Sequence, residues 1–268
     1  MRQTTTILAV VAIFLMSITC FMSEPARGSV LLEDGEGATA TLDAKYAKAS
    51  DALRVAQIVT EESIVPQAGT GAAKYVFSVD SNDFVSVFTR NFISPQNASA
   101  EMSGALEFWF YYPGANFADR SQGKTLDTLE MGFSDGNVNQ GFKIWVVDRE
   151  GASPVILHGL QSNAWNRFHI ELNEQGRFSS IGSTVNGAPV QTSSANIATT
   201  FTGLGSGTNA QVATMWSGLT SFYIQDTHGG GPGVEGFYGM DDMQLIPEPS
   251  SAVLLLVVGL ISQRRRST

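Results

Sequence analysis

Ala105-Leu-Glu-Phe-Trp-Phe-Tyr-Tyr112 is the stretch of this 268-residue chain that decides its fold. Leu106 and the three aromatic residues that follow it at steps of two point to one side. Glu107, Trp109 and Tyr111 point to the other side. A period of two is the repeat of a β-strand with one buried face. The stretch therefore predicts a strand that lines a core with one face and presents two aromatic rings on the other.

The same alternation extends along the chain in both directions. In Arg167-Phe-His-Ile-Glu-Leu172 the apolar residues are expected to point inward, while Arg167, His169 and Glu171 point outward. β-Branched and aromatic residues at period two predict further strands. These are residues 76–80, 84–90, 128–133, 142–147, 221–225 and 239–245.

Turn signals separate these strands. They are Ser134-Asp-Gly136, Glu150-Gly151, Asn186-Gly-Ala-Pro189 and the glycine run at 229–233. Many short strands without βαβ alternation predict an all-β sandwich or barrel. Residues 46–55 are compatible with a short helix, and residues 195–213, rich in Gly, Thr, Asn and Ser, are expected to form a long polar loop.

Short motifs along residues 30–246 resemble those of concanavalin A-like lectins, laminin G-like domains and carbohydrate-binding modules. The motifs are Leu32-Glu-Asp-Gly35, Leu106-Glu-Phe-Trp-Phe110, the run 163–172, Val185-Asn-Gly-Ala-Pro-Val190 and Met240-Asp-Asp-Met-Gln-Leu245. The resemblance implies an all-β fold, a two-sheet antiparallel jelly-roll sandwich. A fold of this kind hosts many functions and does not choose among them.

The last residues of the sequence carry a composite signal. Pro247, Glu248 and Pro249 precede an apolar run at 252–261, and Arg264, Arg265 and Arg266 follow it. The apolar run has about half the roughly 20 residues that a stable spanning helix needs. The arrangement resembles the PEP-CTERM sorting signal of Gram-negative bacteria. That resemblance implies cleavage by an exosortase-type membrane protease, transient membrane contact through a short C-terminal helix, and delivery to the cell surface or extracellular matrix.

The first residues have the layout of a secretory signal peptide: Arg2, an apolar run at 7–18, and small polar residues at 23–29. Cleavage is expected after Ala26 or Gly28. This gives three parts: a signal helix at 1–28, a sandwich domain at 29–246 and a sorting signal at 247–268. Cys20 is the only cysteine and lies in the signal, so the mature domain is expected to have no disulfide. A lipidated Cys20 is an alternative, although Thr19 suits a lipobox poorly.

The expected mature domain is acidic. Residues 29–246 contain 11 lysines and arginines against 23 aspartates and glutamates, a net charge of −12. Such a surface repels nucleic acid and anionic lipid. It suits divalent cations and neutral glycans.

Two kinds of binding site are candidates. For carbohydrate, Trp109 and Tyr111 beside Glu107 are the best placed, since aromatic rings stack on sugar rings and carboxylates bind hydroxyls. Core packing is the better interpretation for each large aromatic residue, Trp109 and Tyr111 included, and it applies equally to the other candidates. These are Trp145, Trp165, Trp216 and Tyr223.

For metal, jelly rolls often hold calcium where the first and last strands pair. Glu33, Asp34 and Glu36 near the start and Asp241 and Asp242 near the end are candidate oxygen ligands for a structural calcium. The competing interpretation is that these are solvated charges at strand ends.

Catalysis has little support in the sequence. The Glu-x-Asp-x-x-Glu strand of laminarinase-type enzymes on this fold is absent, and Glu130 and Asp135 are expected on opposite faces of a strand. The three histidines lack metal-ligand spacing. We therefore expect an exported, non-enzymatic protein of the surface or matrix, which contacts extracellular polysaccharide or serves adhesion. The alternatives are a polysaccharide hydrolase or lyase and a structural coat protein without a ligand.

Overall fold

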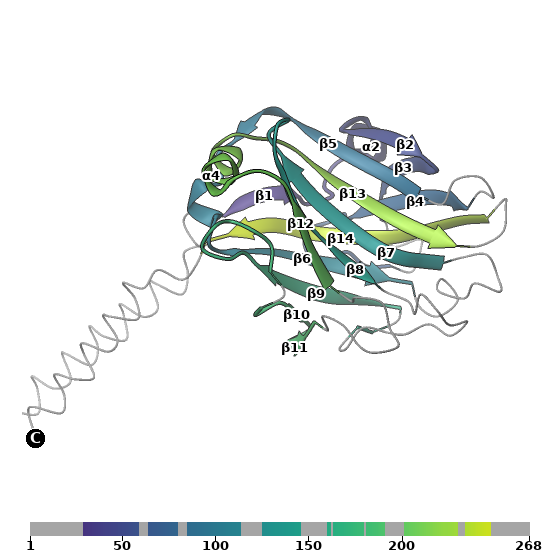
Figure 1. Ribbon diagram of the computed structural model, residues 1–268. Helices are drawn as coiled ribbons and strands as arrows, with labels where there is room; N and C mark the ends of the chain where they lie inside the picture. The colour runs from purple at the N-terminus through teal and green to yellow at the C-terminus, as the bar shows by residue number, and fades with distance from the viewer. Residues whose placement is uncertain are drawn as a thin grey trace, which may run out of the picture.

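Two antiparallel sheets face each other in the computed structural model (Figure 1). The structure describes residues 29–58, 64–79, 85–113, 125–145, 160–161, 163–179, 181–190, 201–229 and 234–247. The predicted all-β, two-sheet antiparallel sandwich is thus confirmed. The signal helix and the short C-terminal helix lie outside the described residues.

The larger sheet has eight described strands in the order β11-β10-β9-β6-β14-β4-β3, with β1 also paired to β14. Their bounds are β1 Val30–Glu33, β3 Ala52–Gln57, β4 Ala73–Val79, β6 Ala105–Tyr112, β9 Ala164–Glu171, β10 Thr184–Val185, β11 Ala188–Pro189 and β14 Val234–Ile246. Because β1 pairs with β14, the first and last described strands run side by side, as expected.

The smaller sheet has six described strands in the order β12-β8-β7-β13-β5-β2. Their bounds are β2 Tyr46–Ser50, β5 Val85–Gln96, β7 Thr125–Ser134, β8 Asn139–Trp145, β12 Phe201–Gly205 and β13 Leu219–Gly229. The helices are short: α2 is Thr39–Ala44, the 3-10 turn η2 is Ser99–Glu101 and α4 is Asn209–Ser217.

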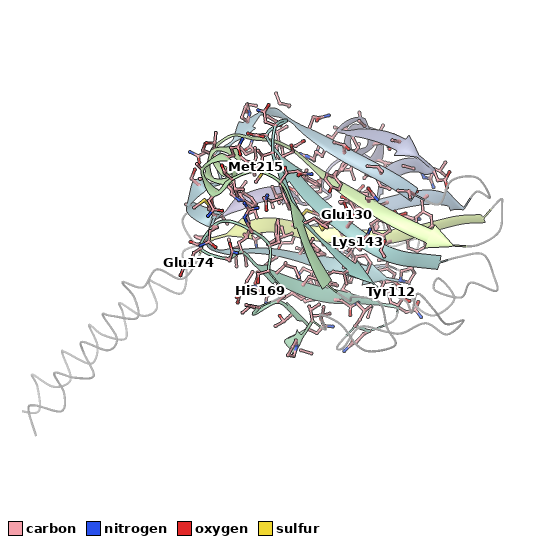
Figure 2. The ribbon with its side chains drawn as sticks, viewed as in Figure 1. Tyr112, Glu130, Lys143, His169, Glu174 and Met215 are labelled. Carbon is pink, nitrogen blue, oxygen red and sulfur yellow. The ribbon has the colours of Figure 1, made fainter. Side chains whose placement is uncertain are left out.

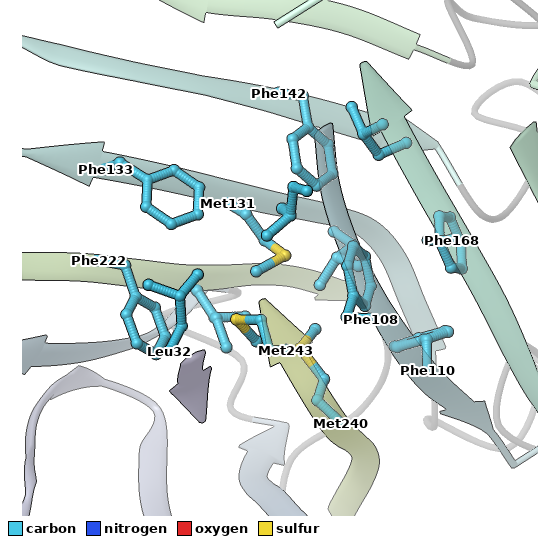
Figure 3. Packing of buried hydrophobic residues seen from close by; sticks show 14 of the residues in the cluster. Leu32, Phe108, Phe110, Met131, Phe133, Phe142, Phe168, Phe222, Met240 and Met243 are labelled. Carbon is cyan, nitrogen blue, oxygen red and sulfur yellow. The ribbon is translucent and has the colours of Figure 1, made fainter. Parts of the chain in front are cut away.

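Aromatic and methionine side chains from both sheets fill the space between them (Figure 3). Phe108 on β6 stacks on Phe168 of β9 with ring centroids 4.9 Å apart. Across the sandwich it also stacks on Phe142 of β8 at 6.4 Å. The inward residues of β6 and β9 are buried, so the alternation expected for these two strands is confirmed.

Two local predictions were wrong. Residues 46–55 form β2 and β3 rather than a helix, because Tyr46 and Val55 are buried in the core and the backbone pairs with β5 and β4. Part of the expected loop at 195–213 is ordered: it contains β12 and the start of α4. Thr208 and Gln211 form a capping box at the start of α4, which buries Met215 and Trp216.

The hairpin between β10 and β11 follows the predicted turn. Asn186 and Gly187 have φ of 51° and 83°, the left-handed values that a two-residue hairpin loop needs. The hairpin adds two short strands beside β9. In the part of the chain that the structure describes, no helix is long and apolar enough to cross a membrane.

Candidate functional site

The outer face of the larger sheet carries the candidate carbohydrate residues in ordered rows. The strand register sets Tyr111 of β6 beside Trp165 of β9, and Trp109 beside Arg167. The next row sets Glu107 beside His169. Outward side chains on neighbouring strands at the same register lie close together. The face therefore runs from aromatic rows at one end to a charged row at the other.

A hollow of about 250 Å³ lies beside the ring of Trp109. Its lining combines the partly exposed ring with charged and amide groups: Glu107, Arg167, Asp242 and Gln244, with Phe108 below. We call it the Trp109 hollow. An apolar ring flanked by a few polar groups is the usual composition of a small-molecule site. Trp109 and Glu107, two of the three residues predicted to bind carbohydrate, therefore line the same hollow.

A bulge in β14 brings the last two polar residues to the hollow. The register with β6 shifts between Asp241 and Gln244, and Asp242 has a φ of 46°. The extra residue lets Met240 and Met243 both point into the core while Gln244 lines the hollow. A simple alternation along residues 239–245 could not have predicted this.

Glu107 is the electrostatic centre of the charged row (Figure 2 shows His169 on β9). Arg167 donates from Nη2 to both carboxylate oxygens of Glu107 at 2.8 Å, and Nδ1 of His169 lies 2.8 Å from one of them. Nε2 of His169 lies 3.7 Å from the carboxylate of Glu171. Burial alone would raise the pKa of Glu107, but the bonds from Arg167 and His169 lower it below its usual value. Glu107 is therefore a charged acceptor that orients the side chains of Arg167 and His169.

Tyr111 is less open than predicted. Its ring contacts Trp165 at 5.5 Å and Phe237 at 6.5 Å between centroids. These three rings pack against Ile58, Ile64 and Ala72, which are buried. Burial also raises the pKa of Tyr111 above its usual value. A second, small hydrophobic cluster thus covers the aromatic end of the outer face.

The predicted calcium ligands do not converge. Glu36 accepts the backbone N–H groups of residues 70 and 71. Glu33 points between the sheets, where its carboxylate accepts bonds from Tyr46, Arg90 and the backbone N–H of Gly35. Asp241 lies on the outer side of β14, where it accepts three backbone N–H groups.

Asp34 accepts a bond from the backbone of Glu36, and Asp242 lines the Trp109 hollow. In the described residues no group of three or more His, Cys, Asp or Glu is placed to hold a metal ion. These residues do not fit a shared calcium in this arrangement. Calcium binding stays a prediction, and melting with and without EGTA tests it.

The remaining aromatic candidates lie away from the hollow. Trp216 is fully buried, and its Nε1 donates to the carbonyl of Gly176 at 2.8 Å. Tyr223 lies on the smaller sheet and donates to Glu130, which also pairs with Lys143 (Figure 2). The side chain of Trp145 lies outside the described residues. Core packing was the right interpretation for Trp216.

Glu130 and Asp135 do not form a catalytic pair. Glu130 lies on β7, whereas Asp135 follows the strand and accepts the backbone N–H groups of Asn137 and Val138 in the turn. His158 and the side chain of His228 lie outside the described residues. So do Glu248, Pro249 and the arginines 264–266 of the predicted sorting signal. Pro247 directly follows β14.

A larger hollow of about 700 Å³ lies where β2 begins and β5 ends. It is lined by Lys45, Arg90 and Ile93 among others. Two aromatic residues line it: Tyr46 is buried and bonded to Glu33 and Tyr75, and Phe92 packs against the core with its ring centroid 6.0 Å from that of Phe222. The Trp109 hollow is therefore the better candidate for stacking a sugar.

Comparisons with known proteins find solved structures of similar fold but do not assign the chain to a family. No family model matches the chain, and no curated protein matches it. One similar solved structure is described as an exo-beta-agarase, at 12% identity and a TM-score of 0.49, covering 82% of this chain and 25% of that one. Another solved structure concerns carbohydrate-binding modules of the β-sandwich superfamily, at 10% identity and a TM-score of 0.39. The match covers 84% of this chain and 64% of that one. The chain spans about a quarter of the length of the first structures that it matches. At these scores the likeness supports no assignment to this chain.

Proposed function

We propose that this chain is an exported, non-enzymatic protein of the cell surface or extracellular matrix that contacts carbohydrate through the Trp109 hollow. The observation that carries the proposal is the partly exposed indole ring of Trp109 on the outer face of a sheet, surrounded by Glu107, Arg167, Asp242 and Gln244. The ring offers an apolar surface to the C–H face of a sugar. The polar groups around it offer partners to the hydroxyls.

The charges in the hollow favour a neutral glycan. Arg167 is already paired with Glu107, so its charge is largely balanced. Asp242 adds a negative charge at the rim, and the expected mature domain carries a net charge of −12. A polyanionic chain would be repelled on approach. Adhesion to neutral polysaccharide is therefore the form of contact that we propose.

The state of the carboxylates supports a non-enzymatic role. Glycoside hydrolysis needs one carboxyl group that keeps a proton near neutral pH. Glu107 has a lowered pKa and holds Arg167 and His169. Asp241 has a raised pKa but is only 1% exposed and bonded to three backbone N–H groups. Neither is arranged to give a proton to a sugar in the hollow.

The export of the protein and its processing at both ends are part of the proposal. The apolar run at 7–18 suits export, and Pro247-Glu-Pro249 followed by an apolar run and three arginines suits an exosortase-type protease. Mass spectrometry of the protein recovered from its native host would show a product close to residues 29–246. Recovery of the full-length mass from the cell interior would contradict this.

A glycan array tests the binding proposal. The purified chain is expected to bind at least one neutral glycan, and Trp109→Ala is expected to lose that binding. Tyr223→Phe, on the outer side of the other sheet, is the matched control and should bind as the native chain does. Binding retained by Trp109→Ala would remove the proposed site. New reducing ends or unsaturated products released from the bound glycan would favour the hydrolase or lyase alternative.

A further inference from the structure

Residues 64–72, here called the strap, cross the outer face of the larger sheet next to the Trp109 hollow. Ile64 and Ala72 are buried against Tyr111, Trp165 and Phe237. The outer side of the strap faces solvent, and Val65 is 66% exposed. The strap is therefore a single layer of chain over an aromatic surface.

Three side chains of the domain fasten the strap along its length. Nε1 of Trp165 donates to the carbonyl of Val65 at 2.7 Å. Asp241 accepts the backbone N–H groups of residues 67 and 68, both at 2.8 Å from Oδ2. Glu36 accepts the backbone N–H groups of residues 70 and 71 and the hydroxyl of Thr70. The strap is thus tied at its start, middle and end.

The middle fastening places the strap directly beside the hollow. Asp241 is the register partner of Trp109 on the adjacent strand, so the two side chains are neighbours on the same face. The backbone at 67 and 68 sits on the carboxylate of Asp241. A sugar ring on Trp109 therefore meets chain, and not open sheet, in the direction of Tyr111.

Without the strap, the outer aromatic surface would be continuous. Tyr111 and Trp165 lie in the row next to that of Trp109 and Arg167 on the same two strands. Such a row could support further units of a long glycan. With the strap in place, Ile64 and Ala72 pack against Tyr111 and Trp165, so the strap lies where a glycan would have to extend beyond Trp109.

We propose that the strap is a wall that restricts the Trp109 hollow to the end of a glycan chain, and that Asp241 is the positioning residue that holds this wall. This inference rests on the proposed function, because it concerns the length of the ligand that the same hollow accepts. The ligand class is the terminal one or two units of a neutral polysaccharide.

Series of oligosaccharides of increasing length, here called ladders, test the inference on the native protein. Cello-, laminari-, xylo- and agaro-oligosaccharides of two, four and six units are titrated by calorimetry. For the ladder that binds, the Kd should stay within about twofold from two units to six, and one protein should bind per glycan chain. Affinity that rises about tenfold with length, or more than one protein on a six-unit chain, would overturn the inference and leave the proposed function standing.

The variant Asp241→Ala tests the role of the fastening. Loss of the acceptor for two backbone N–H groups should loosen the strap and expose Tyr111 and Trp165. Six units should then bind about fivefold more tightly than two. Glu174→Ala, at an exposed turn, is the control and should keep the flat length dependence of the native chain. An unchanged length dependence in a folded Asp241→Ala would exclude Asp241 as the positioning residue.

The outcomes separate the two proposals. If Asp241→Ala does not fold, the ladder on the native chain still decides the length limit. Binding that is lost in Trp109→Ala at every length supports the hollow itself. No binding by the native chain to any ladder would overturn the proposed function, and this inference with it.

Discussion

Phe108 and Trp109 are neighbours on β6 with opposite roles. The ring of Phe108 is 1% exposed and stacks on Phe168 and Phe142. The ring of Trp109 is partly exposed and lines the hollow. One step along a strand separates a side chain that holds the sandwich together from one that is free to meet a ligand.

Alanine substitution at these two positions should separate stability from binding. Phe108→Ala should lower the free energy of unfolding by about 3–5 kcal/mol, because it leaves a cavity between the sheets. Trp109→Ala should lower it by only about 1 kcal/mol, since the ring is partly exposed and lies outside the core between the sheets. Equilibrium unfolding in urea measures both. Equal losses would mean that Trp109 is a core residue.

Asp241 should give the domain a particular pH dependence. Burial raises its pKa in the folded protein to about 6, although the N–H groups of residues 67, 68 and 242 oppose this. Its ordinary value is near 4. A group whose pKa is raised by folding binds a proton more tightly in the folded state. Its contribution to stability is therefore fully present below about pH 4 and is lost as the pH rises through about 6.

The matched variant for this pH effect is Asp241→Asn, which cannot titrate. The melting temperature of the native chain, taken relative to that of the variant, should fall between pH 4 and pH 7. Taking the difference removes the titration of the other carboxylates. A difference that is constant over this range would show that the pKa of Asp241 is not raised.

At the scale of elements, the strands with strong alternation were predictable. From Leu106 in β6 and from Asn166 in β9, every second side chain is buried and those between are half-buried or exposed, and the sequence shows most of this pattern directly. Residues 46–55 were not predictable in this way. Their alanines and charged residues suit a helix locally, but the sheet edges offered by β5 and β4 outweigh that weak preference.

α4 was not predicted from the sequence because the residues before it are typical of a loop. The glycine, threonine, asparagine and serine residues before it indicate a loop, and the helix itself is only nine residues long. The usable signals were Thr208 followed three residues later by Gln211, and then Val212, Met215 and Trp216 at helical spacing. A short helix of this kind relies on its cap and on its buried side.

Removal of the cap should therefore be measurable. Thr208→Ala deletes the side-chain acceptor for the backbone N–H of Gln211 and should destabilise the domain by about 1 kcal/mol. Thermal or urea unfolding checks this. Ser94→Ala, at an exposed position of β5, controls for the loss of a hydroxyl elsewhere in the domain. No difference between the two variants would mean that the cap contributes nothing to the fold.

The candidate site was predictable only in part. Trp109 and Glu107 could be placed on one outward face from the sequence because they share a strand. The strap could not, since Asp241 and Gln67 are 174 residues apart and meet only through the complete fold. The bulge that presents Asp242 and Gln244 was equally hidden, because it breaks the simple alternation of β14.

At the scale of the whole molecule, the sandwich brings its first and last strands together. β1 pairs with β14 through Val30 and Leu245, so the two ends of the domain leave from the same sheet. The Trp109 hollow lies on the outer face of that sheet, away from the core. In the proposed function, the face that carries the Trp109 hollow is the one that meets the extracellular polymer.

The affinity of the Trp109 hollow for the best glycan of the array tests the central claim most directly. Calorimetry should give a Kd for Trp109→Phe within about threefold of the native value, because an aromatic ring is kept. Trp109→Ala should weaken binding by about tenfold or more while the domain stays folded. If Trp109→Ala binds that glycan as tightly as the native chain, the hollow beside Trp109 is not the carbohydrate site.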